Sequence, residues 1–129
     1  MLEKGLIIDE PWISMILRGS KTWEMRKTIT KIRGPIALIR KGSKQVVGTA
    51  DLVDSLPPLS LAEFNKQERR HGIPKDRQAR AASDGWQCPW VLKNAQPLRK
   101  PVAYPHPSGA VIWVNLEPSV VKAIQAQLS

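Results

Sequence analysis

The sequence predicts an α+β domain in which short strands form a small mixed barrel and a few helices are inserted between them. Apolar stretches of β type recur along the chain and are separated by turns that contain Gly or Pro. A smaller number of segments carry helical spacing and helix-start residues. A chain of 129 residues has the size of one domain, so one domain covering residues 1–129 is expected.

The first half of the chain begins with a strand and a helix. The elements expected there are strands at 6–8, 22–26, 36–39 and 45–52 and a helix at 11–18. In the strand at 22–26, alternation places Trp23 and Met25 on one side, with Thr22, Glu24 and Arg26 on the other. Residues 41–44 are expected to form a hairpin turn. Gly48 is typical of a β-bulge or a barrel corner.

The second half starts with helical segments and continues with strands. Ser60 and Glu63 fit a capping box, which predicts a helix to about Arg70 with Phe64 as its core anchor. The other expected elements are a helix at 75–82, strands at 90–95 and 110–116, a possible edge strand at 99–104 and a closing helix at 118–128. The mixture of short strands and inserted helices is what defines the predicted class.

Composition limits the cellular setting and the chemistry. No apolar run approaches the roughly 20 residues that span a bilayer, and the N-terminus lacks a signal-like stretch, so a cytoplasmic protein without membrane contact is expected. Cys88 is the single cysteine, which excludes an internal disulfide. It is expected to be a small buried residue. His71 and His106 lack a flanking ligand pattern, so neither a metal nor another cofactor is expected.

Positive charge is concentrated in one stretch. The formal net charge is +9, and residues 18–44 hold nine basic residues against the single acid Glu24. The nine are Arg18, Lys21, Arg26, Lys27, Lys31, Arg33, Arg40, Lys41 and Lys44. Such concentration favours a polyanionic partner over an evenly solvated surface, and RNA or single-stranded DNA is the expected one.

A short motif inside this stretch resembles a family signature. Gly19, Lys21, Glu24 and Arg26 match the pattern G-x-K-x-x-E-x-R after a short helix, which is the hallmark of the ASCH domain family. The segment 9–12 resembles the family's helix start, and 48–54 resembles the strand that follows. Residues 90–95 and 112–113 resemble late segments of the ASCH domain of eukaryotic transcription coactivators. Residues 60–85 match least.

The resemblance implies a fold and a function. It implies a stand-alone bacterial-type domain with a PUA-like β-barrel and a cleft beside the motif that binds nucleic acid. Within that cleft, Lys21 would meet a phosphate or a base carbonyl as a flexible point charge. Arg26 would contact phosphate with two hydrogen bonds, and Glu24 would accept from an amine or a ribose hydroxyl. A purely structural Lys21–Glu24–Arg26 ion-pair cluster is the open alternative.

Other residues are candidates for contacts with the ligand. Trp12 and Trp90 are the tryptophans best placed to stack on a base, whereas Trp23 and Trp113 are expected in the core. Asn94, next to Lys93, can read a base edge or cap a turn. The hairpin residues expected to contact phosphates, with a solvated hairpin tip as the alternative, are Arg40, Lys41 and Lys44.

Two function classes follow. The leading one is a monomeric binding module, without a cofactor, for single-stranded RNA or DNA or for a modified nucleotide. The alternative is a small hydrolase, since some bacterial relatives deacetylate N4-acetylcytidine with the motif lysine and a threonine. Glu24 stands here at the threonine position, which lowers that possibility. A ribonuclease using Lys21, Glu24 and Tyr104 is a further option, and a protein-binding adaptor is a third class.

Overall fold

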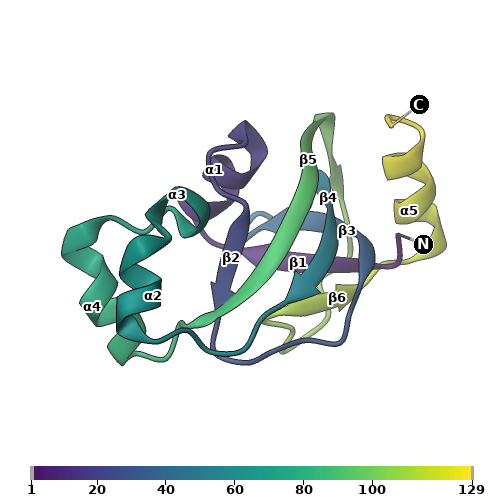
Figure 1. Ribbon diagram of the computed structural model, residues 1–129. Coiled ribbons are helices and arrows are strands. Elements are labelled where there is room, and N and C mark those ends of the chain that lie inside the picture. Colours follow the sequence, from purple (N-terminus) through teal and green to yellow (C-terminus); the bar gives the residue numbers. More distant parts are fainter. Residues whose placement is uncertain (1, 129) are drawn as a thin grey trace.

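The computed structural model describes residues 2–128, which form one curled sheet flanked by short helices (Figure 1). The strands are β1 (Lys4–Ile8), β2 (Trp23–Arg26), β3 (Gly34–Arg40), β4 (Gln45–Ser55), β5 (Cys88–Ala103) and β6 (Trp113–Asn115). The helices are α1 (Trp12–Arg18), α2 (Leu61–Lys66), α3 (Glu68–His71), α4 (Lys75–Ser83) and α5 (Pro118–Gln125). The predicted α+β class with a barrel-like sheet is confirmed.

The sheet has six strands in the order β2-β5-β4-β3-β1-β6. β1 runs parallel to β3, and every other neighbouring pair is antiparallel. Its two outer strands, β2 and β6, are not paired with each other, so the sheet is a half-barrel with an open side. In Figure 1, α2, α3 and α4 lie together beyond β2, whereas α5 lies at the far end of the molecule.

Three groups of buried side chains hold these layers together. Inside the curl of the sheet, Ile13 and Ile16 of α1 pack on Leu38 and Leu52. A second group joins α5 to the outer side of β3 and β1, and Ile124 is completely buried there. The third group forms where Trp23 and Met25 of β2 meet Phe64 of α2. The predicted core roles of Trp23 and Phe64 are therefore confirmed.

Gly48 allows the sheet to bend, as the sequence predicts. The pairing between β4 and β5 shifts register between Val46 and Gly48. A Cβ atom on Gly48 would lie 2.4 Å from the side chain of Leu17 and 2.7 Å from the carbonyl oxygen of Gln96. The absence of a side chain thus lets α1 and β5 approach the bulge closely.

Four sequence expectations about individual elements are corrected. The segments 90–95 and 99–104 form one bent sixteen-residue strand, β5, because its register shifts against β4 absorb the bend. The helix expected from Ser60 to Arg70 is divided at Gln67 into α2 and α3. The expected strand 110–116 is a strand only at 113–115, and Val111 is 74% exposed. β4 extends to Ser55, past the expected end at Leu52.

The C-terminal segment is bound to an unpaired part of β5. Between Pro97 and Val102 β5 has no partner on β4, which leaves the backbone groups of Lys100 without a strand partner. The side chain of Gln127 accepts from the Lys100 amide at 3.0 Å and donates to the Lys100 carbonyl at 2.8 Å. This double hydrogen bond satisfies both backbone groups of Lys100 and holds the C-terminal segment against β5.

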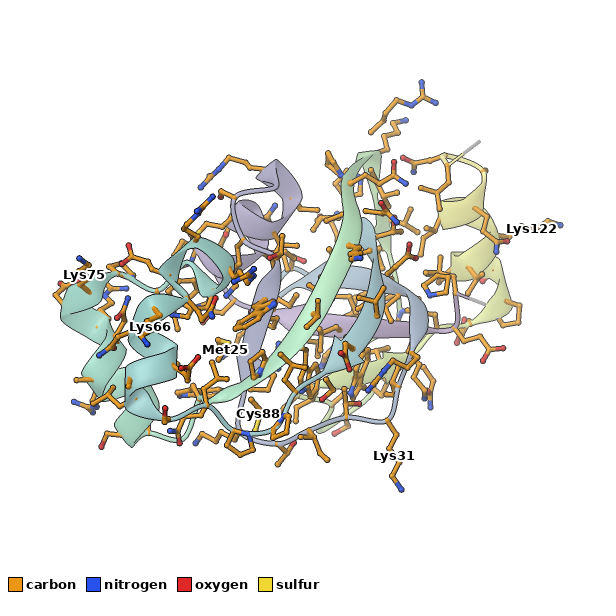
Figure 2. The ribbon with its side chains drawn as sticks, in the orientation of Figure 1. Met25, Lys31, Lys66, Lys75, Cys88 and Lys122 are labelled. Carbon is orange, nitrogen blue, oxygen red and sulfur yellow. The ribbon has the colours of Figure 1, made fainter. Side chains whose placement is uncertain are left out.

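The remaining structural expectations concern Cys88 and membranes. Cys88 is buried at the start of β5, as expected, and burial raises the pKa of its thiol. Figure 2 labels its side chain near the start of β5. Among residues 2–128, no helix combines the length and the apolar character that a membrane-crossing helix requires.

Candidate nucleic-acid interface

A cleft of about 890 Å³ opens at the unclosed side of the half-barrel. It lies between β2, the short strand β1, the segment before β6 and helix α4. The charged and aromatic residues that line it are Asp9, Trp12, Lys21, Glu24, Arg26, Lys27, Lys41, Asp76, Arg77, Arg80, Asp84, Trp86 and Trp90. Apolar side chains complete it, including Val111 and Ile112, which the shortness of β6 leaves exposed.

Lys21, Glu24 and Arg26 form the floor of this cleft. Lys21 is only 2% exposed, and its ammonium donates to the carbonyl oxygen of His71 at 2.5 Å. Its Nζ lies 3.7 Å from Oε1 of Glu24 and 5.2 Å from the ring centroid of Trp12. The expectation of a flexible lysine is therefore wrong: the side chain is held from three sides. Buried polar groups need such partners, since an unpaired ammonium would be costly.

Arg26 joins the two sides of the opening. Its guanidinium donates to Oε2 of Glu24 at 2.9 Å through Nη2 and at 3.2 Å through Nε. The same Nη2 donates to the carbonyl oxygen of Ile7 in β1 at 2.8 Å. Because β6 stops at its pairing with Leu6, the Ile7 carbonyl is left for this contact. The motif therefore has a structural role, which was the open alternative, while its side chains still line the cleft.

Burial controls the protonation of Lys21. Loss of hydration lowers the pKa of its ammonium from 10.5 to about 8, and the neighbouring Glu24 carboxylate opposes this change. A cation near Lys21, the Arg26 guanidinium, lowers the pKa further. Lys21 is therefore a much stronger acid than a surface lysine, and a measurable fraction is neutral slightly above neutral pH.

His71 positions the Lys21 ammonium from behind. Its ring is fully buried, and Nδ1 accepts from the backbone N–H of Ile73 at 2.9 Å while Nε2 contacts the carbonyl oxygen of Phe64 at 2.7 Å. These two partners require a neutral ring protonated at Nε2. Burial lowers the pKa of this imidazole, and the nearby Lys21 adds to the effect. The sequence analysis considered His71 only as a possible metal ligand and did not predict this positioning role.

The tryptophans line the cleft in different ways. Trp90 is 3% exposed, is stacked on Trp113 with 5.7 Å between ring centroids, and donates its indole N–H to the Thr28 carbonyl at 2.8 Å. It is a wall of the cleft rather than an accessible stacking surface. Trp12 is half-buried and lines the cleft beside Lys21. Trp86 is 38% exposed and has the Lys27 ammonium 4.8 Å from its ring.

The outer wall of the cleft comes from the segment that the sequence placed least well. Arg77, Arg80, Ala81 and Asp84 line the cleft from α4 and its C-terminal cap. Counted from Arg77, the other three follow after three, four and seven residues, which places all of them on one helical face. This spacing is the signal that could have identified them. The sequence analysis named neither these arginines nor Trp86 among the expected contact residues.

Four predicted contact residues lie outside the cleft. Arg40 pairs with the Glu10 carboxylate near its mouth, and Lys44 is exposed in the β3–β4 turn. Lys93 and Asn94 lie on β5, where Asn94 has a φ of 55° and donates to Oδ2 of Asp51 at 2.9 Å. Asn94 therefore stabilises an irregular point of the strand. Of the predicted set, Trp12, Lys21, Glu24, Arg26, Lys41 and Trp90 line one cleft.

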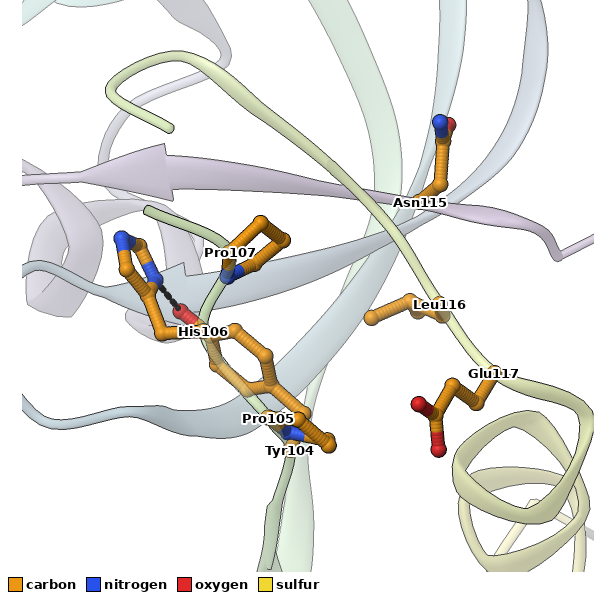
Figure 3. A pocket seen from close by; sticks show the side chains of 7 residues that line it. All are labelled: Tyr104, Pro105, His106, Pro107, Asn115, Leu116 and Glu117. Atoms are coloured by element: carbon orange, nitrogen blue, oxygen red, sulfur yellow. Dashed lines mark hydrogen bonds between the residues drawn. The ribbon is translucent and has the colours of Figure 1, made fainter. Parts of the chain in front are cut away.

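Tyr104 belongs to a separate pocket of about 190 Å³ (Figure 3). Its hydroxyl is hydrogen-bonded to Nδ1 of His106 at 2.9 Å, and Nε2 of His106 contacts the Ala110 carbonyl at 3.0 Å. Burial raises the pKa of the phenol. Tyr104 is not among the residues that line the main cleft, so it and the Lys21–Glu24 pair do not form one site.

The basic stretch does not form one surface. Of its nine cations, Lys21, Arg26, Lys27 and Lys41 line the cleft. Arg33 lies near Asp54 at 3.7 Å instead, and Lys31 points away from the body of the molecule in Figure 2. The charge of the cleft is completed by Arg77 and Arg80 of α4. Folding thus selects part of the basic stretch and adds cations from elsewhere.

A curled mixed sheet with a motif-lined basic cleft at its open side defines an α+β protein of half-barrel type. The family model for the ASCH domain matches residues 6–102, which is most of the chain. The protein therefore belongs to the ASCH domain family. A comparison with curated protein sequences found no match.

Solved structures support the same fold. The chain is similar to the ASCH protein of Zymomonas mobilis, with a TM-score of 0.71 and 16% identity over 96% of this chain and 94% of that one. One single-substitution variant of that protein gives a TM-score of 0.72 at 17% identity with the same coverage. Another gives 0.69 at 16% identity, covering 96% of both chains. At these identities the likeness concerns the fold alone.

Proposed function

We propose that the cleft binds single-stranded RNA or DNA, or a modified nucleotide, without a cofactor. The observation that carries the proposal is that six basic side chains and three indoles line one hollow of about 890 Å³. Cations supply attraction to phosphates that does not depend on sequence, and accessible indoles can stack on any base. Membership of the ASCH family adds support, because RNA-related functions are plausible for this family.

The charge of the cleft favours an anion of modest size. Six basic and four acidic residues line it, so its excess of positive charge is small. Among residues 2–128, neither Lys27 nor Arg77 has a carboxylate within ion-pair distance, whereas Arg80 pairs with Asp84 and Lys41 approaches Asp9 at 3.9 Å. A few phosphates can be contacted here, in contrast to the long track that a uniformly basic face would offer.

Titration of single-stranded and duplex oligonucleotides, followed by tryptophan fluorescence at two salt concentrations, tests the proposal. We expect binding that weakens with salt, and a Lys27→Ala/Arg77→Ala variant that binds less tightly with a shallower salt slope, by about 0.7 for each lost phosphate contact. A Lys31→Ala/Lys122→Ala variant is the matched control, since both side chains project from the surface outside the cleft. Absence of any salt-dependent response would contradict the proposal.

A hydrolase acting on RNA or a modified nucleoside is the second candidate. The specific observation in its favour is a buried lysine with a pKa of about 8 beside a carboxylate in a cleft, which is suited to general acid–base chemistry. Incubation with N4-acetylcytidine and with RNA tests it. Turnover that disappears in Lys21→Met but persists in Lys31→Met would make the protein an enzyme, and no turnover would leave binding as the function.

A further inference from the structure

The floor and the mouth of the cleft differ in how much positive charge is available. On the floor, Lys21 is committed to the His71 carbonyl, and Arg26 is committed to Glu24 and the Ile7 carbonyl. The cations nearer to solvent are called the rim here and comprise Lys27, Lys41, Arg77 and Arg80. All four are exposed. Charge that can meet a phosphate is therefore located at the rim.

One acceptor atom on the floor has no donor within 3.5 Å among residues 2–128. Oε2 of Glu24 accepts both hydrogen bonds from Arg26, whereas Oε1 lies 3.7 Å from the Lys21 ammonium, an ion-pair contact longer than a hydrogen bond. Within residues 2–128, every fully buried polar side-chain atom has a hydrogen-bond partner. Oε1 has no such partner at hydrogen-bond distance, so it is not fully buried, and the residue to which it belongs lines the cleft. The floor therefore offers a negatively charged hydrogen-bond acceptor to a ligand in the cleft.

A phosphate would be poorly held at this place. It would have to lose its hydration beside a carboxylate whose two neighbouring cations are already paired. A neutral group with an N–H donor would instead satisfy Oε1 and gain a charge-assisted hydrogen bond. The flat edge of a nucleobase is such a group, and the half-buried ring of Trp12 lines the cleft beside Lys21, where a base can lie against it.

We infer that an unpaired nucleobase binds in the cleft with its pairing edge pointing to the floor, where a base N–H donates to Oε1 of Glu24. The adjoining phosphates stay outside, at the rim. The inference rests on the proposed function and adds the orientation of the bound nucleic acid and a selectivity for unpaired bases. The N–H groups on the pairing edge are occupied in a duplex, so only a single-stranded or extruded base can make this contact. This arrangement replaces the expectation that Lys21 meets a phosphate or a base carbonyl and that Arg26 contacts phosphate.

The test changes the ligand, because substitution of Glu24 would also disturb the fold. Single-stranded oligonucleotides of uridine, cytidine and adenosine are compared with the same lengths of 3-methyluridine, N4,N4-dimethylcytidine and N6,N6-dimethyladenosine. Each pair has the same phosphates and riboses and differs in the base N–H donors. For each base that binds, we expect the methylated partner to bind about tenfold more weakly or worse, the usual effect of losing a hydrogen bond to a charged group.

The outcomes separate this inference from the function on which it rests. Equal affinity of the parent and methylated oligonucleotides would overturn the inference and leave nucleic-acid binding intact. No binding of any oligonucleotide would reject the proposed function itself. The Lys27→Ala/Arg77→Ala variant serves as an internal control, since it should weaken both members of a pair by the same factor.

Inorganic pyrophosphate provides a second measurement by NMR. It should shift the backbone signals of Lys27 and Arg77 at the rim and leave the Arg26 guanidinium and the Trp90 indole N–H unchanged. A single-stranded oligonucleotide should shift both sets. Saturable shifts of Arg26 and Trp90 by pyrophosphate alone would place phosphate on the floor and refute the proposed orientation.

Discussion

Replacement of Glu24 by Gln should remove the charge that holds the floor together. The carboxylate is 8% exposed and lies between two cations, at 2.9 Å from the Arg26 guanidinium and 3.7 Å from the Lys21 ammonium. Breaking a buried ion pair by removing one partner costs about 3–5 kcal/mol, because the remaining charge stays buried and uncompensated. A domain of this length has a free energy of unfolding of about 6–19 kcal/mol. Glu24→Gln should thus lower the unfolding midpoint by about 10 °C or more.

The effect of Glu24→Gln should depend on pH with a definite sign. The folded state lowers the pKa of Lys21 to about 8, so this group binds fewer protons folded than unfolded between pH 8 and 10.5. Its contribution therefore becomes more favourable as pH rises through that window. Above about pH 8 Lys21 is neutral and no longer needs Glu24. The difference in free energy of unfolding between the two proteins should be larger at pH 6.5 than at pH 9.

Urea unfolding at pH 6.5 and pH 9, followed by circular dichroism, measures the loss in free energy of unfolding and its dependence on pH. Thermal unfolding measures the shift of the midpoint. Glu63→Gln is the matched control, because Glu63 is 54% exposed and lies 4.0 Å from Lys66 in a surface pair. Such a pair contributes about 0–1 kcal/mol. The reasoning would be refuted by a loss for Glu24→Gln no larger than that of the control, or by a difference that grows with rising pH.

Three further predictions concern other parts of the fold. Gly48→Ala should lower the free energy of unfolding by about 1–3 kcal/mol, because its Cβ would lie 2.7 Å from the Gln96 carbonyl oxygen; unchanged urea unfolding would contradict the packing argument. The His71 ring should stay neutral below pH 6.5 in an NMR titration, and stability should fall as pH drops below 6.5 because the unfolded chain binds the proton more readily; titration at 6.5 would disagree. Gln127→Ala should speed amide hydrogen exchange at Lys100, because it removes the acceptor of that amide, whereas Gln125→Ala, exposed on α5, should not; equal exchange in the two variants would contradict this contact.

Local patterns determined most of the elements and the motif. Helix α1 ends at Gly19, which has a φ of 84°, and the bulge occurs at Gly48, as the glycines predict. Alternation along β2 correctly predicted that Trp23 and Met25 pack together, here against Phe64 of α2, although Met25 also lines the cleft beside Glu24 and Arg26. These features depend on neighbours in sequence, so the sequence is sufficient for them.

Long-range contacts decided the rest. The segment 110–116 is apolar enough for a strand, yet only 113–115 is paired as a strand with β1. The Ile7 N–H still donates to the Ile112 carbonyl, but the Ile7 carbonyl accepts from Arg26 instead of from this segment. The merging of two expected strands into β5 likewise depends on where β4 bends. Pairing partners far apart in the chain set strand length, and no local pattern encodes them.

The candidate site divides in the same way. The sequence by itself determined the chemical types of the motif, a lysine, a glutamate and an arginine next to a short helix, and the excess of nearby positive charge. Only the tertiary structure decided that Lys21 is buried against the His71 carbonyl, that Arg26 is held by Ile7, and that Trp86 and the arginines of α4 complete the cleft. The physical reason is that burial and partners, which set the charge and reach of a side chain, depend on which segments fold together.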